Sequence, residues 1–134
     1  MFQILFKFRN NANLIWKCFH EASLLWSRLH FLKVKIAVGT IIKAEENNFL
    51  KKPSIILHID FGPKFGIKKS SAQLKENYLC DNLINKQILA VLNFRPKQIG
   101  NIISEVLVLG LPNQREDAIL VSPDLKIKNG QLLY

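Results

Sequence analysis

Cysteine is scarce in this sequence, with only Cys18 and Cys80 among 134 residues. The two form no Cys-x-x-Cys pair, so we expect neither a disulfide framework nor a thiolate zinc site. The histidines are equally few, and none is spaced with a cysteine or carboxylate as a metal site requires. We therefore expect no metal and no cofactor, and a reducing compartment, the cytoplasm, as the location.

Acidic residues are also few. The chain has 10 of them against 19 lysines and arginines, which gives a net charge of +9. Such an excess favours a polyanionic partner, either nucleic acid or an anionic membrane surface. A basic surface without a partner is the alternative that charge alone leaves open.

The sequence lacks the usual arrangements of catalytic residues. It shows no carboxylate pair, no Cys-His pair and no nucleophile elbow. The stretch GPKFGIKKS has two glycines but neither the P-loop spacing nor the G-x-G-x-x-G spacing. These absences favour a binding protein over an enzyme.

Long hydrophobic runs are missing too, which excludes a membrane-spanning helix in residues 1–30. This segment is basic, rich in aromatic residues and helical in its spacing. Its apolar side chains fall on one face: Leu14, Ile15, Cys18, Ala22, Leu25, Trp26 and Leu29. We expect a separate amphipathic extension over residues 1–30 that packs on protein. A transit peptide and a membrane-surface helix are the alternatives, the membrane being the less favoured.

From residue 31 onward the pattern is typical of strands. Apolar and polar residues alternate in segments separated by turn residues, and the expected strands are 34–46, 54–62, 65–73, 83–94, 104–110, 117–123 and 129–133. Residues 73–78 suggest a short helical turn, and Gly39 suggests a bulge or bend inside the first strand. Together they predict an all-β fold for residues 31–134, a five-stranded Greek-key barrel of the OB type with one short helix.

Several stretches carry a family resemblance. VGTIIKAEE, IDFGPKFGIKKSSAQL, LINKQILAVLNF, SEVLVLG and SPDLKIKNG follow one another in the order seen in the CsaA family, which this chain resembles over about residues 31–134. That family belongs with the tRNA-binding domains found alone or appended to methionyl- and tyrosyl-tRNA synthetases. The resemblance implies an OB barrel, a homodimer, and binding of structured RNA or of unfolded polypeptide. It does not extend to residues 1–30.

The candidate site residues come from the resemblance and from the basic segments. Asn93 and Pro96 match an Asn-Phe-x-Pro turn, and Ser104 and Glu105 match a Ser-Glu pair that opens the next strand. The expected RNA-binding residues are Lys64, Lys68, Lys69, Ser70, Asn93, Arg95, Lys97 and Ser104; Pro96 and Glu105 are expected to support the loop. The sequence departs from the family pattern at Gln98, Asn101 and Ile103, so the anion-binding role is expected to fall on the other basic residues.

Two functions follow from these residues. The first is a non-catalytic module that binds tRNA or other structured RNA by backbone and shape, with strong dependence on salt. The second is an export-related chaperone that holds unfolded polypeptides in apolar grooves of a homodimer, with weak dependence on salt. The sequence leaves open which ligand is the natural one.

Overall fold

The protein is described by a computed structural model that covers residues 12–49, 53–115 and 117–133, with the side chains of the first helix described from residue 23 onward. The chain divides into two compact units, Met1–Lys33 and Val34–Tyr134. The predicted domain boundary at residues 30 and 31 stays a prediction.

The first unit contains helix α1, Ala12–Lys33. Neither glycine nor proline interrupts this stretch, which is what a helix of 22 residues requires. Six large apolar side chains in its second half are exposed in the chain: Leu24, Leu25, Trp26, Leu29, Phe31 and Leu32. Of the predicted apolar face, Leu14, Ile15, Cys18 and Ala22 lie outside the described side chains. Within the described part of the chain, no helix has the length and apolar character needed to cross a membrane.

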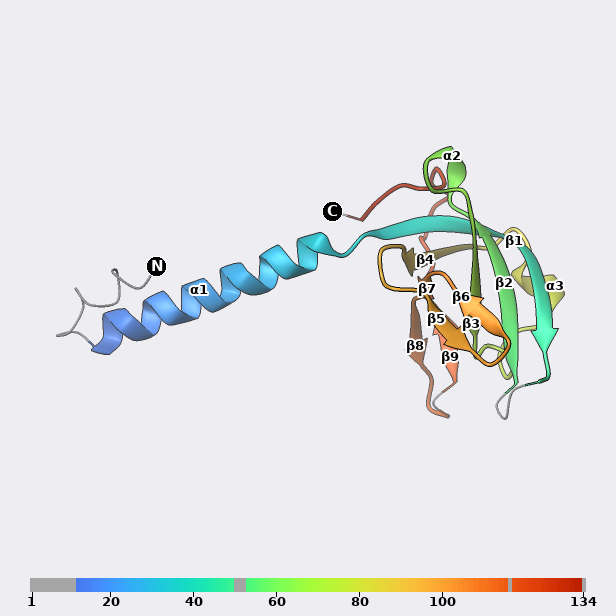
Figure 1. Ribbon diagram of the computed structural model, residues 1–134, viewed down its shortest axis with the longest axis horizontal. Helices are drawn as coiled ribbons and strands as arrows, with labels where there is room; N and C mark the ends of the chain where they lie inside the picture. Colours follow the sequence, from blue (N-terminus) through green and yellow to red (C-terminus); the bar gives the residue numbers. More distant parts are fainter. Residues whose placement is uncertain (1–11, 50–52, 116, 134) are drawn as a thin grey trace. The chain divides into compact units, whose positions relative to one another are not determined.

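The second unit is built on a curled antiparallel sheet of five strands (Figure 1). Its order is β3-β2-β1-β4-β7, and the strands are β1 Ile36–Asn47, β2 Ser54–Asp60, β3 Ile67–Ala72, β4 Gln87–Val91 and β7 Leu107–Val108. The first four match predicted segments, with β1 ending one residue later than expected. The predicted OB-type barrel is confirmed.

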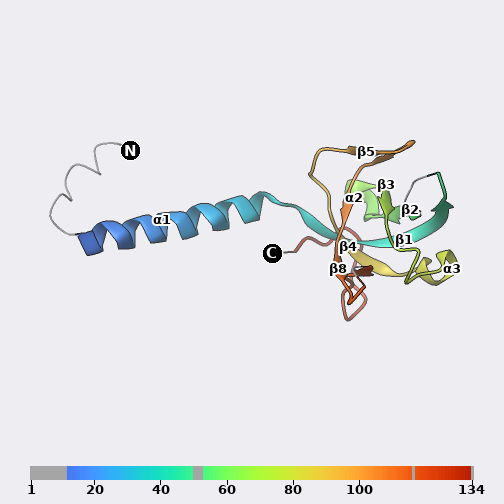
Figure 2. The ribbon, with the colours of Figure 1, turned by 90° about the horizontal axis from the view of Figure 1, so that it is seen from below.

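Two small hairpins complete the barrel. They are β5 Lys97–Ile99 with β6 Ile102–Ser104, and β8 Gly110–Pro112 with β9 Ala118–Leu120. Figure 2 shows β5 and β8 on opposite sides of the curled sheet. The turn between β5 and β6 uses Gly100 with φ of 59°, a backbone conformation that glycine adopts at no steric cost. The first hairpin was not predicted, and the single strand expected over residues 104–110 is wrong, since the backbone passes from β6 to β7 to β8 within it.

Two short helices flank β3. Helix α2, Gly62–Phe65, joins β2 to β3, and helix α3, Cys80–Leu83, precedes β4. Between β3 and α3 the chain makes a single helical turn, in which the Tyr78 N–H donates to the Leu74 carbonyl oxygen at 3.0 Å. The expected terminal strand over 129–133 is reduced to one bridge, between Leu132 and Ala37 of β1.

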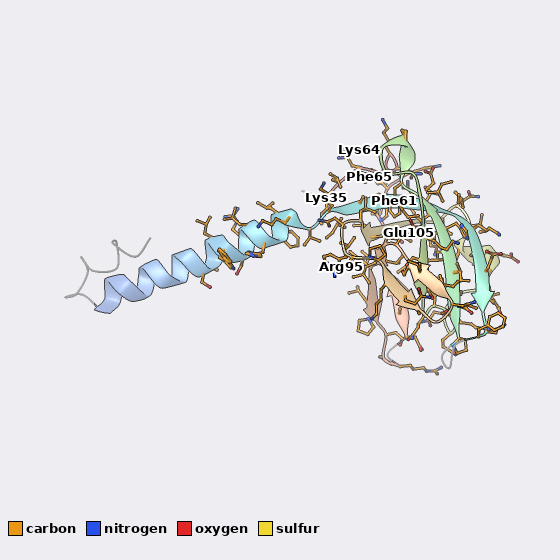
Figure 3. All side chains as sticks on the ribbon, viewed as in Figure 1. Lys35, Phe61, Lys64, Phe65, Arg95 and Glu105 are labelled. Atoms are coloured by element: carbon orange, nitrogen blue, oxygen red, sulfur yellow. The ribbon has the colours of Figure 1, made fainter. Side chains whose placement is uncertain are left out.

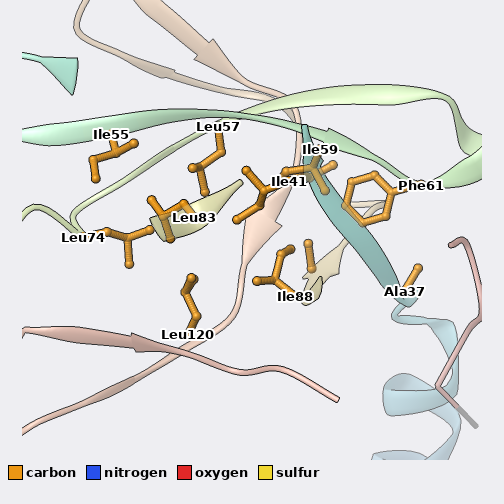
Figure 4. Packing of buried hydrophobic residues seen from close by; sticks show 12 residues of the cluster. Ala37, Ile41, Ile55, Leu57, Ile59, Phe61, Leu74, Leu83, Ile88 and Leu120 are labelled. Carbon is orange, nitrogen blue, oxygen red and sulfur yellow. The ribbon is translucent and has the colours of Figure 1, made fainter. Parts of the chain in front are cut away.

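The core explains why Gly39 is a glycine. Ile41, Ile59, Phe61 and Ile88 are fully buried, and Phe61 lies at one end of the cluster (Figure 4). A Cβ atom at Gly39 would lie 2.6 Å from both Ile59 Cγ2 and the Phe61 ring. The expected bulge at this glycine is wrong, because the register of β1 against β2 shifts between Ile41 and Lys43 instead. Gly39 makes room for the core.

Candidate nucleic-acid interface

A groove of about 380 Å³ runs along the side of the barrel where β3 meets the β5–β6 hairpin and β7. Five of the predicted site residues line it: Ser70, Arg95, Lys97, Ser104 and Glu105. The predicted residues Lys64, Lys68, Lys69, Asn93 and Pro96 do not line it, although Lys69, Asn93 and Pro96 are neighbours of lining residues along the chain. The remaining lining is largely apolar and comes from β3, β5, β7, β8 and β9 and from the loops next to them, including Phe94.

Glu105 closes the barrel between β3 and β6. Its backbone N–H donates to the Lys69 carbonyl oxygen at 2.8 Å, and its carboxylate Oε2 accepts the Lys69 backbone N–H, also at 2.8 Å. The other oxygen, Oε1, lies 3.6 Å from Lys68 Nζ. Glu105 therefore uses both its backbone and its side chain to hold the edge of β3.

Ser70 and Ser104 form a buried pair of hydroxyls beside this closure. Their Oγ atoms lie 3.1 Å apart, and each donates toward the Val106 carbonyl oxygen, at 3.1 Å from Ser70 and 3.0 Å from Ser104. Only 2% of Ser70 and 8% of Ser104 is exposed. The hydroxyl groups of these two residues, which were expected to contact RNA, therefore form hydrogen bonds inside the wall of the groove.

Asn93 anchors the loop that carries Arg95. Its Oδ1 atom accepts the backbone N–H of Lys35 at 2.8 Å, across 58 positions of sequence. Lys35 is exposed and lies directly before β1. Sequence reasoning missed Lys35, because no local pattern shows that the start of β1 meets the loop after β4. The resulting hydrogen bond places one more cation beside that loop.

Lys64 lies apart from the other predicted cations. It belongs to α2, where its Nζ atom lies 5.3 Å from the centroid of the Phe65 ring. Figure 3 shows Lys64 well separated from Arg95. Lys64 therefore lies away from Arg95, and its expected role in RNA binding stays a prediction.

The cations at the rim differ in how they are neutralised. Among the described residues, the ion pairs within 4.0 Å involve Lys43, Lys68, Lys75 and His58. Arg95 and Lys97 take part in none of these ion pairs and are exposed. Two uncompensated cations at the mouth of a groove attract an anion more strongly than paired ones.

Comparison with known proteins gives the class of this barrel. Residues 36–132 match the family described as "Putative tRNA binding domain". The methionine–tRNA ligase of Nanoarchaeum equitans (strain Kin4-M) is 34% identical over 106 residues, which are 79% of this chain and 13% of that protein. The chain spans about 13–15% of the length of the curated ligases that it matches.

Solved structures narrow the class further. The CsaA chaperone protein of Picrophilus torridus is 44% identical with a TM-score of 0.74, over 80% of this chain and 97% of that one. The chaperone CsaA of Bacillus anthracis (strain Ames) is 42% identical with a TM-score of 0.73, over 78% and 94% of the two chains. The chain therefore belongs to the CsaA family of tRNA-binding domains, which confirms the resemblance seen in its motifs.

Proposed function

We propose that the barrel binds tRNA or other structured RNA through its backbone and shape, without catalysis, and that it does so as a homodimer in the cytoplasm. The observation that carries the proposal is the family match over residues 36–132 together with the uncompensated Arg95 and Lys97 at the mouth of the groove. The net charge of +9 supports the same partner.

The cations have the chemistry that this partner requires. Lysine and arginine neutralise phosphates and release condensed counterions, and this release dominates affinity for nucleic acids. In the proposal Arg95, Lys97, Lys68 and Lys69 contact phosphates, with Lys35 added by the structure. Asn93, Ser70, Ser104, Pro96 and Glu105 shape the surface that presents these cations, and Lys64 would reach only a more distant part of a large RNA.

Lysine variants test the proposal. Bulk tRNA is titrated into the wild type, Lys97→Ala and Lys68→Ala at several salt concentrations between about 50 and 200 mM. We expect wild-type affinity to fall steeply with salt. Each variant should bind more weakly, with the slope of log K against log salt reduced by about 0.7 to 0.9, one phosphate contact.

Lys43→Ala is the matched control. Lys43 lies on β1, does not line the groove, and pairs with Glu45 Oε1 at 2.9 Å, so its loss removes a lysine that is not among the proposed phosphate contacts. The proposal fails if the wild type does not bind tRNA, or if Lys97→Ala and Lys68→Ala bind as Lys43→Ala does.

Polypeptide binding is a second candidate. Two proteins named as CsaA chaperones are 42% and 44% identical to this chain, and the groove is lined mainly by apolar side chains. Titration with a permanently unfolded polypeptide tests it. We would expect affinity that changes little over the same range of salt and competition by apolar peptides.

A further inference from the structure

The groove beside Arg95 combines an aromatic ring, an apolar interior and two cations. Phe94 lines it with 48% of its surface exposed, so its ring is accessible to a ligand in the groove. Leu107, with 49% exposed, lines the same groove. Arg95 comes directly after Phe94 and Lys97 three residues after it, and both line the same groove.

We infer that this groove accepts an unpaired base of the bound RNA, which stacks on Phe94 while Arg95 and Lys97 hold the adjoining phosphates. The inference rests on the proposed function and adds to it a specific element of the ligand, a nucleotide outside the double helix. The barrel would then read a loop, bulge or end in addition to the backbone.

The position of the ring is defined by its neighbours. Asn93 is tied to Lys35 by the 2.8 Å hydrogen bond, and Pro96 fixes the backbone angle φ two residues after Phe94. The ring is therefore carried by a loop that is held on both sides. A preformed aromatic surface loses little conformational entropy when a base stacks on it, and each base has a face to stack.

The charge at the rim favours a nucleotide over an apolar peptide side chain. A nucleotide joins a flat apolar base to an anionic phosphate, and the groove offers an apolar surface beside two cations without carboxylate partners in the described part of the chain. A stretch of apolar polypeptide would fill the interior but leave Arg95 and Lys97 unused. The volume of about 380 Å³ suits one base rather than a duplex.

The test uses the full chain with two RNA probes. One is a stem–loop with 2-aminopurine at an unpaired loop position, and the other is the same stem as a fully paired duplex. Phe94→Leu keeps an apolar side chain of similar size and removes the aromatic face, whereas Phe94→Tyr keeps the face. Lys97→Ala serves as a control that removes a phosphate contact.

We expect Phe94→Leu to weaken stem–loop binding by at least about 5-fold, the lower bound for loss of one base–aromatic stack, and to leave duplex binding unchanged. Phe94→Tyr should bind as the wild type does, and Lys97→Ala should weaken both probes. The 2-aminopurine fluorescence should be quenched by the wild type and much less by Phe94→Leu.

Other outcomes overturn the inference. Equal effects of Phe94→Leu on stem–loop and duplex would mean that the ring supports only the loop. An unchanged affinity would mean that no base enters the groove. Displacement of the fluorescent base by an apolar peptide at lower concentration than by RNA would assign the groove to polypeptide. Absence of binding to either RNA by the wild type would instead refute the proposed function.

Discussion

At the scale of single residues, the hydroxyl groups of Ser70 and Ser104 show how this barrel satisfies a buried carbonyl. Val106 is buried, and its oxygen lies within hydrogen-bonding distance of both serine Oγ atoms. A buried carbonyl without a donor costs about 1 to 3 kcal/mol, so the second serine provides a replacement when the first is lost. The two residues are therefore expected to be coupled.

A double-mutant cycle measures this coupling. Ser70→Ala and Ser104→Ala should each lower the free energy of unfolding by about 0.5 to 1.5 kcal/mol, because one donor to Val106 remains. The double variant should lose more than the sum of the two, because the carbonyl then has no donor. Urea unfolding of the four proteins checks this. An additive result would show that water replaces the hydroxyls and that the site is less closed than its burial indicates.

Sequence reasoning reached residues of the site and a supporting role for Glu105, but not the partners of these residues. Ser104 and Glu105 stand out because polar residues precede an apolar run, and the run itself suggests a strand. Their partners, Lys69 and Ser70, lie more than thirty positions away, and no local pattern reveals a contact of that kind. The hydrogen bond between Asn93 and Lys35 could not be predicted for the same reason. Roles of this kind depend on the closure of the barrel, which is a tertiary property.

At the scale of elements, β1, β2 and β4 could be predicted because each is a run of five or more residues rich in apolar and β-branched side chains. The β5–β6 hairpin could not, because its strands have only three residues each and one begins with the basic Lys97. The segment 104–110 looked like one strand because its apolar residues are continuous. Its division among three strands is set by pairing partners that lie elsewhere in the chain.

The far end of β1 is tied to the turn after β3 by an ion pair. Lys75 Nζ lies 2.9 Å from Glu46 Oε2 and also donates to Asn48 Oδ1 at 2.9 Å. The hydrogen bond from Lys75, helped by its charge, holds the pKa of the Glu46 carboxyl below its usual range. A carboxyl group with a lowered pKa in the folded state contributes stability that is present above its unfolded pKa and is lost as the pH falls.

Glu46→Gln tests this link between elements. At neutral pH we expect the variant to unfold at lower urea concentration than the wild type. The difference should shrink as the pH falls below about 4.3, the usual pKa of glutamate, because the wild-type carboxylate then also becomes neutral. Added salt should also shrink this difference between variant and wild type, since the pair is exposed.

Glu76→Gln is the control, because Glu76 is exposed and forms none of the ion pairs found among the described residues. A difference that persists unchanged in acid would exclude the ion pair as its cause.

At the scale of the whole molecule, the chain consists of a helical unit and a barrel, and the family match covers only the barrel. The homodimer is implied by the family resemblance, and the expected strands 117–123 and 129–133, beyond five barrel strands, were available to build it. The structure uses that material inside one chain, since β9 pairs with β8 and Leu132 bridges to Ala37. A dimer would therefore form through the side chains that these segments leave exposed.

The β8–β9 hairpin leaves apolar side chains exposed. Leu111 is 63% exposed and Ile119 is 38% exposed, and the two face each other across the ladder. An exposed strand edge with apolar side chains is a surface that proteins normally cover. A second copy of the chain would cover it by symmetry, with the same hairpin contributing from each subunit.

Light scattering coupled to size exclusion tests the dimer. We expect light scattering to give the eluted protein a molar mass twice the 15.4 kDa of one chain. Leu111→Lys should shift it toward the monomer, because a charge buried at a symmetric interface is repeated on both sides of the axis and is left unpaired. Ile42→Lys is the matched control, since Ile42 is a similarly exposed apolar residue on β1, away from the hairpin.

A wild type that elutes as a monomer would refute the dimer. A dimer that withstands Leu111→Lys would place the interface on another surface, and deletion of residues 1–33 from that variant would then show whether the helical unit supplies it.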